Sequence, residues 1–301
     1  MKVCGFTFIK NAVRFDFPVV EAITSVLPLC DHFVAAVGYS DDDTRKIIEN
    51  IDPGKITIVD TVWDETLKKG GEVYAAETNK AFDAVPSGYD WCFYIQGDEA
   101  VHEKYLSLIR ESMQKNLMNR EVDGLLFGFR HFYGTYGYVA DSRRWYRNEI
   151  RVIRNDKSIR SYRDAQGFRK NGRKLKVVKI PAEIYHYGWV RPPRFMQQKV
   201  DGVKQYYNGE HSEIADKNRV NCEFNYSENY DSLEKFKGTH PAVMKERINR
   251  LCWYMDADLN RINMKFKYKF LYKFEKLTGI RLFEYRNYIL LDSKKKRKCS
   301  L

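Results

Sequence analysis

Two adjacent carboxylates follow a short apolar run in the first third of the chain. The segment reads DWCFYIQGDEA over residues 90–100, so that Asp98 and Glu99 come just after a predicted buried strand. In open α/β sheets, ligands bind outside the carboxyl ends of the strands. Carboxylate oxygens at that place suit Mg²⁺ or Mn²⁺, and such an ion can in turn hold phosphate groups. The segment therefore predicts a site for a divalent cation and a diphosphate.

Apolar runs and helical patterns alternate on both sides of this segment. The predicted strands cover residues 3–9, 33–37, 55–62, 91–95 and 124–129. The predicted helices cover residues 17–30, 44–51, 69–84 and 102–119. Strands and helices that alternate at this spacing predict βαβ units and a largely parallel sheet.

The second half of the chain has a less regular pattern. The predicted elements there are short strands at 177–181 and 182–187 and helices at 195–207 and 242–259. Residues 208–237 are polar, and we expect them to form loops. The motif Met255-Asp256-Ala257-Asp258 falls in the last helix, where its two carboxylates do not face each other, so we interpret it as a solvated face.

The composition is that of an ordinary globular protein with an excess of positive charge. The chain has 301 residues, 44% of them hydrophobic, and a formal net charge of +12. This length allows one large domain, or one domain with an appendage. The six cysteines form no CxxC pair, which argues against a zinc or redox motif and favours free thiols in a reducing cytoplasm. We expect no signal peptide, because residues 1–10 are too short for one, and no membrane span.

Most of the positive charge lies at the C-terminus. Residues 265–301 hold twelve Lys and Arg and three acidic residues, a net charge of +9. The run KFKYKFLYKF (265–274) alternates with period two, yet Phe266, Phe270 and Phe274 also share a helical face, so periodicity leaves strand and helix open. Basic and aromatic residues mixed in this way are typical of segments that bind anionic lipid headgroups, and a simple solvated tail is the alternative.

The order of the motifs resembles glycosyltransferase family 2, the inverting enzymes of the GT-A fold, over roughly residues 2–190. GYSDDDT (38–44) is similar to the turn that follows the second strand in that family, although the paired aspartates that normally precede it are absent. GGEVYAAETNK (70–80) is similar to the helix before the metal-binding strand. QGDE (96–99) is similar to the DxD-type motif, with Gln96 in place of the first aspartate.

Two further segments look like the lipopolysaccharide-core type of the family. NEIRVIRN (148–155) is similar to a strand of that subgroup, and IYHYGW (184–189) supplies a His-Tyr pair. RDAQGF (163–168) stands where the subgroup has a His-Glu pair. The resemblance implies an α/β fold of the GT-A type, with a Rossmann-like, mostly parallel central sheet flanked by helices and a C-terminal helical, basic region. We expect a catalytic domain over residues 1–235 and an extension over 236–301.

The resemblance also implies roles for individual residues. Asp98 and His186 would hold Mn²⁺ or Mg²⁺, with a UDP- or GDP-type sugar donor. The nearest candidate for the catalytic base is Asp164, with Asp141 and Glu149 as rivals, and Glu99 is either an orienting catalytic residue or a solvated one. The residues expected to contact the donor are Thr7, Asn11, Ser40, Asp42, Asn79, Lys80, Gln96, Arg151 and Trp189. Arg191 is expected to close over the donor together with Trp189.

The implied function is the transfer of a sugar to a glycan or a lipid-linked acceptor in cell-surface polysaccharide or lipopolysaccharide synthesis. Such an enzyme would be cytoplasmic, with residues 265–301 as a possible contact to the inner face of the membrane. A nucleotidyltransferase is disfavoured because CGFTFIKN (4–11) lacks the Gly-rich loop with Arg and Lys. A transferase fold that has lost its activity and a basic nucleic-acid-binding protein are the remaining alternatives; no RNA-binding motif is present, so nucleic acid is not the expected partner.

Overall fold

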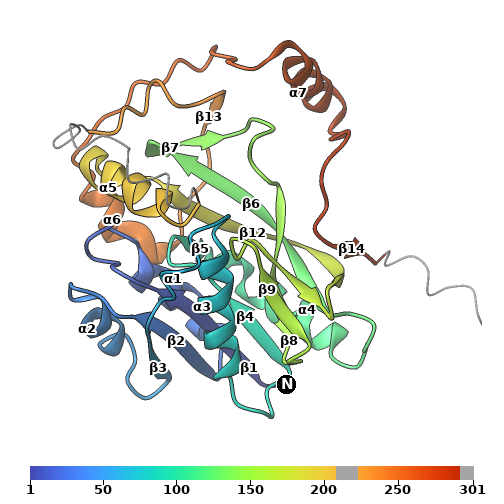
Figure 1. Cartoon of the computed structure of the whole chain (residues 1–301). Helices are drawn as coiled ribbons and strands as arrows, with labels where there is room; N and C mark the ends of the chain where they lie inside the picture. The colour runs from blue at the N-terminus through green and yellow to red at the C-terminus, as the bar shows by residue number, and fades with distance from the viewer. Residues whose placement is uncertain (208–222, 292–301) are drawn as a thin grey trace, which may run out of the picture.

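Four parallel strands form one half of the central sheet in the computed structural model, which describes residues 1–207 and 223–291. They are β1 (Val3–Ile9), β2 (His32–Gly38), β3 (Ile56–Thr61) and β4 (Trp91–Tyr94), in the spatial order β3-β2-β1-β4. Helices α1 (Val19–Val26), α2 (Thr44–Glu49) and α3 (Glu72–Asp83) connect them (Figure 1). All four strands therefore end at the same edge of the sheet.

The other half of the sheet contains strands of both directions. β8 (Asn148–Arg154) lies antiparallel between β4 and β6 (Gly124–Tyr133), and β12 (Lys176–Trp189) runs parallel to β6. The shorter strands of this half are β5 (Glu99–Val101), β7 (Thr135–Ala140), β13 (Leu233–Lys235) and β14 (Ile289–Leu290). A separate small sheet consists of β9 (Ile159–Tyr162), β10 (Gly167–Lys170) and β11 (Arg173–Lys174).

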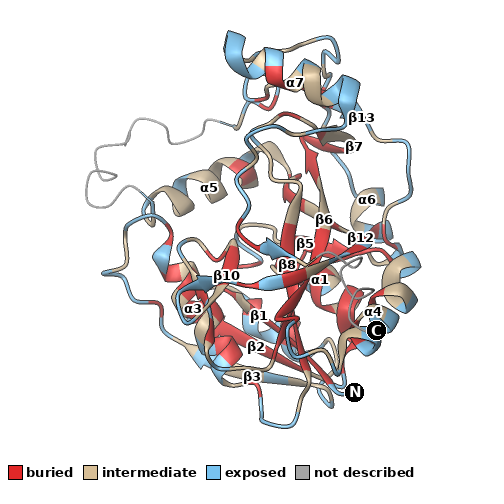
Figure 2. Ribbon diagram, turned by 90° about the vertical axis from the view of Figure 1, so that its right-hand side faces the viewer, coloured by how far each residue is buried: buried red, intermediate tan, exposed pale blue. Residues whose placement is uncertain are grey.

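The central sheet is covered on both faces. On one face, alternate residues of the strands, among them Val3 and Phe33, pack with α1 and with α4 (Leu106–Asn116). On the other face, the intervening residues, such as Cys4 and Phe6, pack with α3 and with the small sheet. Burial on both faces explains why β1 and β4 appear in the sequence as continuous apolar runs. Figure 2 shows this buried centre. The structure thus confirms the predicted fold class, a Rossmann-like α/β fold with a mostly parallel sheet flanked by helices.

Two predicted elements differ from the structure. The short strands expected at 177–181 and 182–187 are one strand, β12, whose pairing with β6 shifts register between Lys179 and Glu183. Pro181 lies in that interval and cannot donate a ladder hydrogen bond, which explains the irregularity. The strand nevertheless continues through it to Trp189. The helix expected at 242–259 is wrong beyond Asn249, because only a 3-10 turn (Ala242–Met244) and α6 (Lys245–Asn249) form.

Tertiary contacts explain the missing part of that helix. The indole of Trp253 donates a hydrogen bond to the carbonyl oxygen of Gly134 at 2.7 Å, and Met255 is buried against the same glycine. Residues 251–258, which include both of these side chains, form neither helix nor strand. Asp256 and Asp258 are solvent-exposed, as expected, but they do not lie on a helix.

The basic C-terminal region begins with a helix, α7 (Phe266–Thr278), so the ambiguous run 265–274 is helical. Asp43 occupies the N-cap position of α2. Cys4, Cys30 and Cys92 are buried free thiols, Cys252 is exposed, and Cys222 and Cys299 lie outside the described residues. Within residues 1–207 and 223–291, no helix has the length and apolar character needed to cross a bilayer.

Candidate active site

Asp98 and His186 meet because the short strand β5 pairs with β12. In this antiparallel ladder Glu99 lies opposite His186, and the backbone N–H of Tyr187 donates to the carbonyl oxygen of Asp98 at 2.7 Å. The side chain of Asp98 therefore reaches the imidazole of His186, with Oδ1 of the aspartate 3.8 Å from Nε2 of the histidine. Both side chains are 12% exposed, so the pair is largely withdrawn from water.

The protonation of His186 follows from its neighbour His131. Nε2 of His131 lies 2.8 Å from the carbonyl oxygen of Tyr146, and because a carbonyl can only accept, this nitrogen carries the proton. The neutral ring of His131 then has its lone pair on Nδ1, which lies 3.0 Å from Nδ1 of His186. Burial lowers the pKa of both rings, which favours their neutral forms. His186 consequently donates from Nδ1 and directs the lone pair of Nε2 toward Asp98.

Two basic side chains approach Asp98 from the other side. Nζ of Lys199, on helix α5 (Pro193–Lys204), lies 3.2 Å from Oδ2 of Asp98 and donates to the carbonyl oxygen of Gly188 at 2.7 Å. Arg191 is fully buried and donates to the carbonyl oxygens of Phe15 and Gly188, while its Nε has no hydrogen-bond partner among the described residues. The site thus combines one carboxylate, one imidazole lone pair and two cations.

These charges act on one another. Burial by itself would raise the pKa of Asp98, but the ammonium of Lys199 and the guanidinium of Arg191 outweigh it, and the pKa is lowered. Burial and the nearby Arg191 lower the pKa of Lys199 to about 8. Asp98 is therefore an anion at neutral pH, held among positive groups that outnumber it. A further negative group at this place would be attracted by Lys199 and Arg191.

Gly188 lies directly against the side chains of Asp98 and His186. A Cβ atom at this position would lie 2.6 Å from Nε2 of His186 and 2.8 Å from Oδ2 of Asp98. A Cβ atom does not come this close to an unbonded nitrogen or oxygen, so a side chain here would displace one of the two groups. The glycine at position 188 therefore lets Asp98 and His186 lie close to the backbone of β12.

Glu99 and Arg151 are buried together beneath this site. Each side chain is fully buried, and the guanidinium donates to both carboxylate oxygens, at 2.8 Å and 2.6 Å. Burial alone would lower the pKa of Arg151, but the carboxylate of Glu99 outweighs it and raises the pKa. Glu99 also accepts a hydrogen bond from the backbone of Gln96 at 3.1 Å. The pair fixes the turn that carries Asp98 onto strand β8, and neither side chain is exposed to a ligand.

Asp164 lies on the turn between β9 and β10. Its neighbours Arg163 and Ala165 both have positive φ angles, 56° and 58°, so the turn has an unusual backbone shape. The side chain of Gln96 donates to the carbonyl oxygen of Ala165 at 3.4 Å, which places the turn beside the QGDE segment. The hydroxyl of Tyr207 donates to Asp164 at 3.4 Å. The turn that carries the predicted base thus lies next to Gln96 of the QGDE segment.

The predicted donor contacts at the ends of β1 and β2 come together in part. The hydroxyl of Ser40 accepts from the backbone N–H of Asn11 at 2.9 Å, and the side-chain oxygen of Asn11 is buried with no hydrogen-bond partner in the part of the chain that the structure describes. Asp42 accepts from the backbone of Arg14 at 2.7 Å and from both the backbone and the hydroxyl of Thr44, so its carboxylate shapes the loop. Thr7 is buried in β1.

Asn79 and Lys80 hold neighbouring segments to α3. Asn79 donates to the carbonyl oxygen of Ser161 at 3.1 Å and accepts from its N–H at 2.9 Å, which ties the helix to strand β9. Lys80 donates to the carbonyl oxygen of Val62 at 2.9 Å and pairs with the buried Glu77 at 2.6 Å. Both side chains have structural partners on the helix side of the site.

Aromatic side chains gather between these segments. Trp63 follows β3, Tyr74 lies on α3, and Tyr206 and Tyr207 follow α5. Their ring centroids are 5.6 to 6.1 Å apart, and Phe8 of β1 joins them. The sequence analysis did not single out these residues, although a tryptophan just after a strand end was a visible signal. The predicted donor contact Trp189 packs in a separate aromatic cluster, stacked on Tyr133 at 6.0 Å.

The two rivals for the catalytic base are poorly suited to accept a proton. Burial raises the pKa of Glu149 to about 8, because its effect is larger than the opposing effect of the nearby Arg151. This carboxyl is therefore mainly protonated at neutral pH. Asp141 already accepts hydrogen bonds from Ser232 and Tyr272, both at 2.6 Å, and pairs with Lys276 at 2.8 Å. Asp164 therefore remains the best-placed candidate.

Asp98 and His186 are compatible with a divalent cation as partial ligands. No group of three or more His, Cys, Asp or Glu among residues 1–207 and 223–291 could hold a metal ion by itself. Two facing lone-pair atoms, Oδ1 of Asp98 and Nε2 of His186, nevertheless suit an ion that takes its other ligands from phosphate and water, as Mg²⁺ commonly does. The hydrogen bond from His186 to His131 orients the ring as second-sphere partners of metal ligands do.

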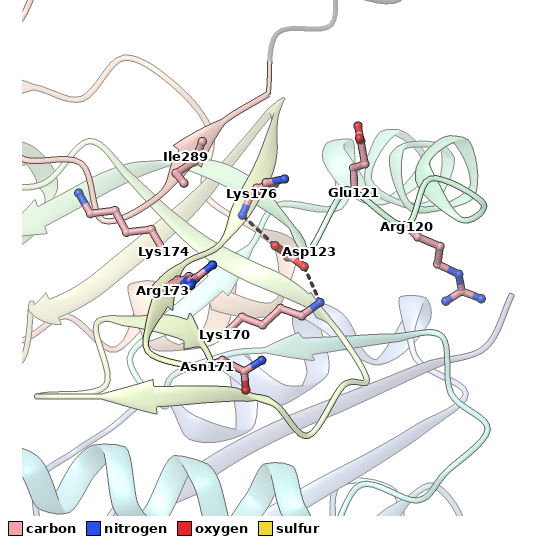
Figure 3. A pocket seen from close by; sticks show the side chains of 9 residues that line it. All are labelled: Arg120, Glu121, Asp123, Lys170, Asn171, Arg173, Lys174, Lys176 and Ile289. Carbon is pink, nitrogen blue, oxygen red and sulfur yellow. Dashed lines mark hydrogen bonds and ion pairs between the residues drawn. The ribbon is translucent and has the colours of Figure 1, made fainter.

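A pocket of about 740 Å³ lies at the amino-terminal ends of β6 and β12 (Figure 3). Five basic side chains line it, namely Arg120, Lys170, Arg173, Lys174 and Lys176. Asp123 partly neutralises them, because it pairs with Lys170 at 2.9 Å and accepts from the backbone of Lys176 at 3.0 Å. The residues predicted to bind the donor do not line this pocket, so the candidate active site lies elsewhere.

No model of a known protein family matches the chain, and no curated protein matches it. Among solved structures, S. aureus TarS is 13% identical with a TM-score of 0.40, over 67% of this chain and 39% of that chain. S. aureus TarS 1-349 in complex with UDP is 12% identical with a TM-score of 0.39, over 67% and 64%. The 4-diphosphocytidyl-2C-methyl-D-erythritol synthase from Anaerococcus prevotii is 12% identical with a TM-score of 0.33, over 51% and 71%. Likenesses this distant assign no activity to the chain.

Proposed function

We propose that this protein is an inverting glycosyltransferase of the GT-A type that moves a sugar from a nucleotide-sugar donor to an acceptor hydroxyl. The observation that carries the proposal is the meeting of Asp98 with His186, flanked by Lys199, at the carboxyl edge of a Rossmann-like sheet. A carboxylate, a neutral imidazole and buried cations at this edge suit a diphosphate with a divalent cation.

The donor diphosphate would lie against Asp98 and His186, with Mn²⁺ or Mg²⁺ between them. When bound, the cation stabilises the negative charge of the departing nucleoside diphosphate. The imidazole ligand favours Mn²⁺ over the harder Mg²⁺. Lys199 and Arg191 would exchange their present contacts in part for phosphate oxygens, which adds preorganised positive charge where charge develops.

The nucleoside would lie among the aromatic side chains of Trp63, Tyr74, Tyr206 and Tyr207. Tyr207 is 40% exposed, and its ring, packed against Tyr74, offers a face on which the base of a UDP- or GDP-type donor can stack. Asn11 and Ser40, at the ends of β1 and β2, lie on the same edge, and the unpartnered side-chain oxygen of Asn11 can accept a hydrogen bond from the nucleotide.

Asp164 would accept the proton from the acceptor hydroxyl during transfer. The acceptor oxygen forms the new bond to the anomeric carbon of the sugar, the bond from that carbon to the phosphate oxygen breaks, and the electron pair leaves with the nucleoside diphosphate. A carboxylate within hydrogen-bond reach of the hydroxyl provides the general base that this displacement needs. Glu99 acts as a positioning residue, because it holds Arg151 and the turn that carries Asp98.

We further propose a glycan or a lipid-linked molecule as the acceptor, in the synthesis of cell-surface polysaccharide or lipopolysaccharide. The enzyme would then act in the cytoplasm, at the inner face of the membrane. The alternative is a transferase fold without activity, which the replacement of the first DxD aspartate by Gln96 motivates. Gln96 offers only a neutral side chain, and its Nε2 donates to the hydroxyl of Tyr94 at 3.2 Å.

Donor binding tests this proposal. Wild-type protein is titrated with a panel of UDP- and GDP-sugars, with and without Mn²⁺, by thermal shift and calorimetry. We expect one donor to stabilise the protein in a Mn²⁺-dependent manner, and Asp98→Asn to weaken that binding by on the order of 100-fold, because the variant keeps the shape but loses the charge that attracts the ion.

Asp256→Asn is the matched control, because this exposed carboxylate belongs to the Asp-Ala-Asp sequence at 256–258, which is separate from the QGDE segment of the site. Its donor affinity should equal that of the wild type. If no donor binds with or without Mn²⁺, the transferase proposal is wrong and the inactive-fold alternative is favoured.

A further inference from the structure

Helix α7 turns its apolar stripe toward solvent. Phe266, Phe270 and Leu277 are spaced i, i+4 and i+11, so they lie on one face of the helix. Their exposed fractions are 88%, 63% and 87%. A surface helix ordinarily turns its apolar stripe toward the core and its charged residues toward water. Figure 2 shows most of α7 as exposed.

The opposite face of α7 is the polar one, and it contacts the protein. Glu275 pairs with Arg143 at 2.6 Å, and the hydroxyl of Tyr272 donates to Asp141 at 2.6 Å. Leu271 is the only buried residue of the helix. The orientation of α7 is therefore fixed by ion pairs and hydrogen bonds, and the exposed apolar face is a consequence of this attachment.

The turn after α7 continues the apolar surface. Ile280, Phe283 and Tyr285 are all exposed, and the side chain of Phe283 is 87% so. Phe283 has a φ angle of 56°, a left-handed conformation that costs a bulky residue of the order of 1 kcal/mol or more. The adjacent carbonyl oxygen of Leu282 accepts a hydrogen bond from Arg143, which helps to hold this turn in place. A strained backbone thus presents an aromatic ring to solvent next to α7.

The charges around this surface are positive. Lys267, Lys269 and Lys273 flank or interrupt the apolar stripe, and none of them has an ion-pair partner among the described residues. The one acidic residue of α7, Glu275, is engaged by Arg143 on the inner face. The exposed face therefore combines aromatic and aliphatic side chains with lysines, and it carries no carboxylate.

We propose that α7 and the turn through Tyr285 dock on the surface of an anionic lipid bilayer. Lysines attract anionic headgroups, and exposed Phe and Leu enter the boundary between headgroups and acyl chains. A second copy of the chain is a poorer occupant, because a two-fold contact would place the same lysine-rich surface against itself. This inference does not depend on the proposed sugar transfer, although it would bring the enzyme close to a lipid-linked acceptor.

Vesicle sedimentation of the full chain tests the docking surface. Wild-type protein is mixed with vesicles that contain phosphatidylglycerol and, separately, with neutral phosphatidylcholine vesicles. We expect binding to the anionic vesicles only, and weaker binding in high salt. The combined variant Phe266→Ser, Phe270→Ser, Leu277→Ser should lose at least about tenfold in partition coefficient, because its apolar anchors are gone. Each of Lys267→Gln, Lys269→Gln and Lys273→Gln should lose on the order of fivefold.

The control variant carries Val62→Ser, Met118→Ser and Tyr254→Ser, three equally exposed apolar residues outside this surface. It should bind vesicles as the wild type does. Point variants are preferable to deletion of residues 265–301, since deletion would also remove the ion pairs of Glu275. Donor binding and thermal stability, measured on the same proteins, show whether each variant is folded.

Equal binding of the wild type and the α7 variants would overturn the proposal, as would an absence of binding to anionic vesicles. A wild-type dimer in sedimentation velocity that the serine variant converts to a monomer, without vesicle binding, would instead assign the surface to a second copy. Loss of vesicle binding with unchanged donor binding supports the membrane surface and leaves the transferase proposal to its own test.

Discussion

Gly188 lies directly against the side chains of Asp98 and His186 in the candidate site. We predict that Gly188→Ala lowers donor-dependent turnover by on the order of 100-fold, because the added methyl group would lie 2.6 Å from Nε2 of His186 and must displace it or Asp98. The measurement is turnover of the donor identified by the binding panel, together with its Mn²⁺ dependence. Loss of the Mn²⁺ effect would show that the methyl group acts at this pair.

Gly137→Ala is the control for this substitution. Gly137 also lies in a strand of the central sheet, and the nearest atom to its added Cβ is 3.7 Å away, an ordinary contact. This variant should keep wild-type turnover. Equal turnover of the two variants would contradict the prediction that a side chain at position 188 disturbs His186 or Asp98.

The buried carboxyl of Glu149 makes stability depend on pH. Burial raises its pKa from an ordinary 4.5 to about 8, and one side-chain oxygen has no hydrogen-bond partner among the described residues. The folded protein therefore binds more protons than the unfolded chain between these values, and stability falls as pH rises through this window. The full shift corresponds to as much as ~5 kcal/mol.

We predict that Glu149→Gln removes this dependence, because the amide is neutral at every pH. Thermal denaturation of both proteins from pH 5 to pH 9 is the measurement. The variant should be about as stable as the wild type at pH 5 and clearly more stable at pH 8 to 9. Parallel curves for the two proteins would show that Glu149 is not the titrating group.

Single residues were predictable to different degrees. Asp98, His186 and Asp164 were named from motif order; the structure brings Asp98 to His186 and places the turn that carries Asp164 beside Gln96. Lys199 was missed, because it lies on a helix with no motif and reaches Asp98 only through the fold. Glu99 is adjacent to Asp98, yet successive residues of an extended chain point to opposite sides, which explains why it pairs with the buried Arg151 instead.

At the scale of elements, Asn79 couples helix α3 to the hairpin that carries Asp164. We predict that Asn79→Ala lowers kcat by roughly 10-fold to 100-fold with little change in the KM for the donor, because the two lost hydrogen bonds leave the base less well positioned. Stability should fall by about 1–2 kcal/mol. Steady-state kinetics and thermal denaturation measure the two effects.

Asn116→Ala is the matched control, since the amide of Asn116 donates to Ser112 within helix α4, away from the hairpin. It should lose a similar amount of stability and keep its kcat. If both variants lose kcat equally, general destabilisation explains the result and the coupling through Asn79 is not supported.

The elements that were predicted well are those whose own residues show, by their apolar pattern, which faces are buried. The strands of the parallel half are apolar runs because both faces are covered, and this signal is local. The end of the helix at Asn249 depends on Trp253 and Met255 contacting Gly134, more than a hundred residues away in sequence. The join of 177–181 with 182–187 into β12 depends on the neighbouring strand β6. Neither contact can be predicted from the periodicity of the local sequence.

At the scale of the whole molecule, the described part of the C-terminal segment, residues 236–291, contacts the central sheet and its flanking loops at several points. Phe236 and His240 pack on Phe132 of β6, Lys276 pairs with Asp141, and β14 pairs with the start of β12. Leu271 is buried in the same segment. The division expected from the sequence, between a domain of residues 1–235 and an extension of 236–301, stays a prediction, and these contacts cross its boundary.

Truncation tests whether this segment is an independent extension. We predict that a chain ending at Met264 is destabilised by at least ~3 kcal/mol, or roughly 6 °C in Tm, because Asp141 and Arg143 lose the partners that Lys276 and Glu275 provide. A chain ending at Leu291 keeps α7 and β14 and should melt within about 2 °C of the full chain. Thermal denaturation of the three proteins is the measurement. An unchanged Tm for the shorter chain would mean that residues 265–291 add no stability to the central sheet, and the predicted separation into two parts would then be supported.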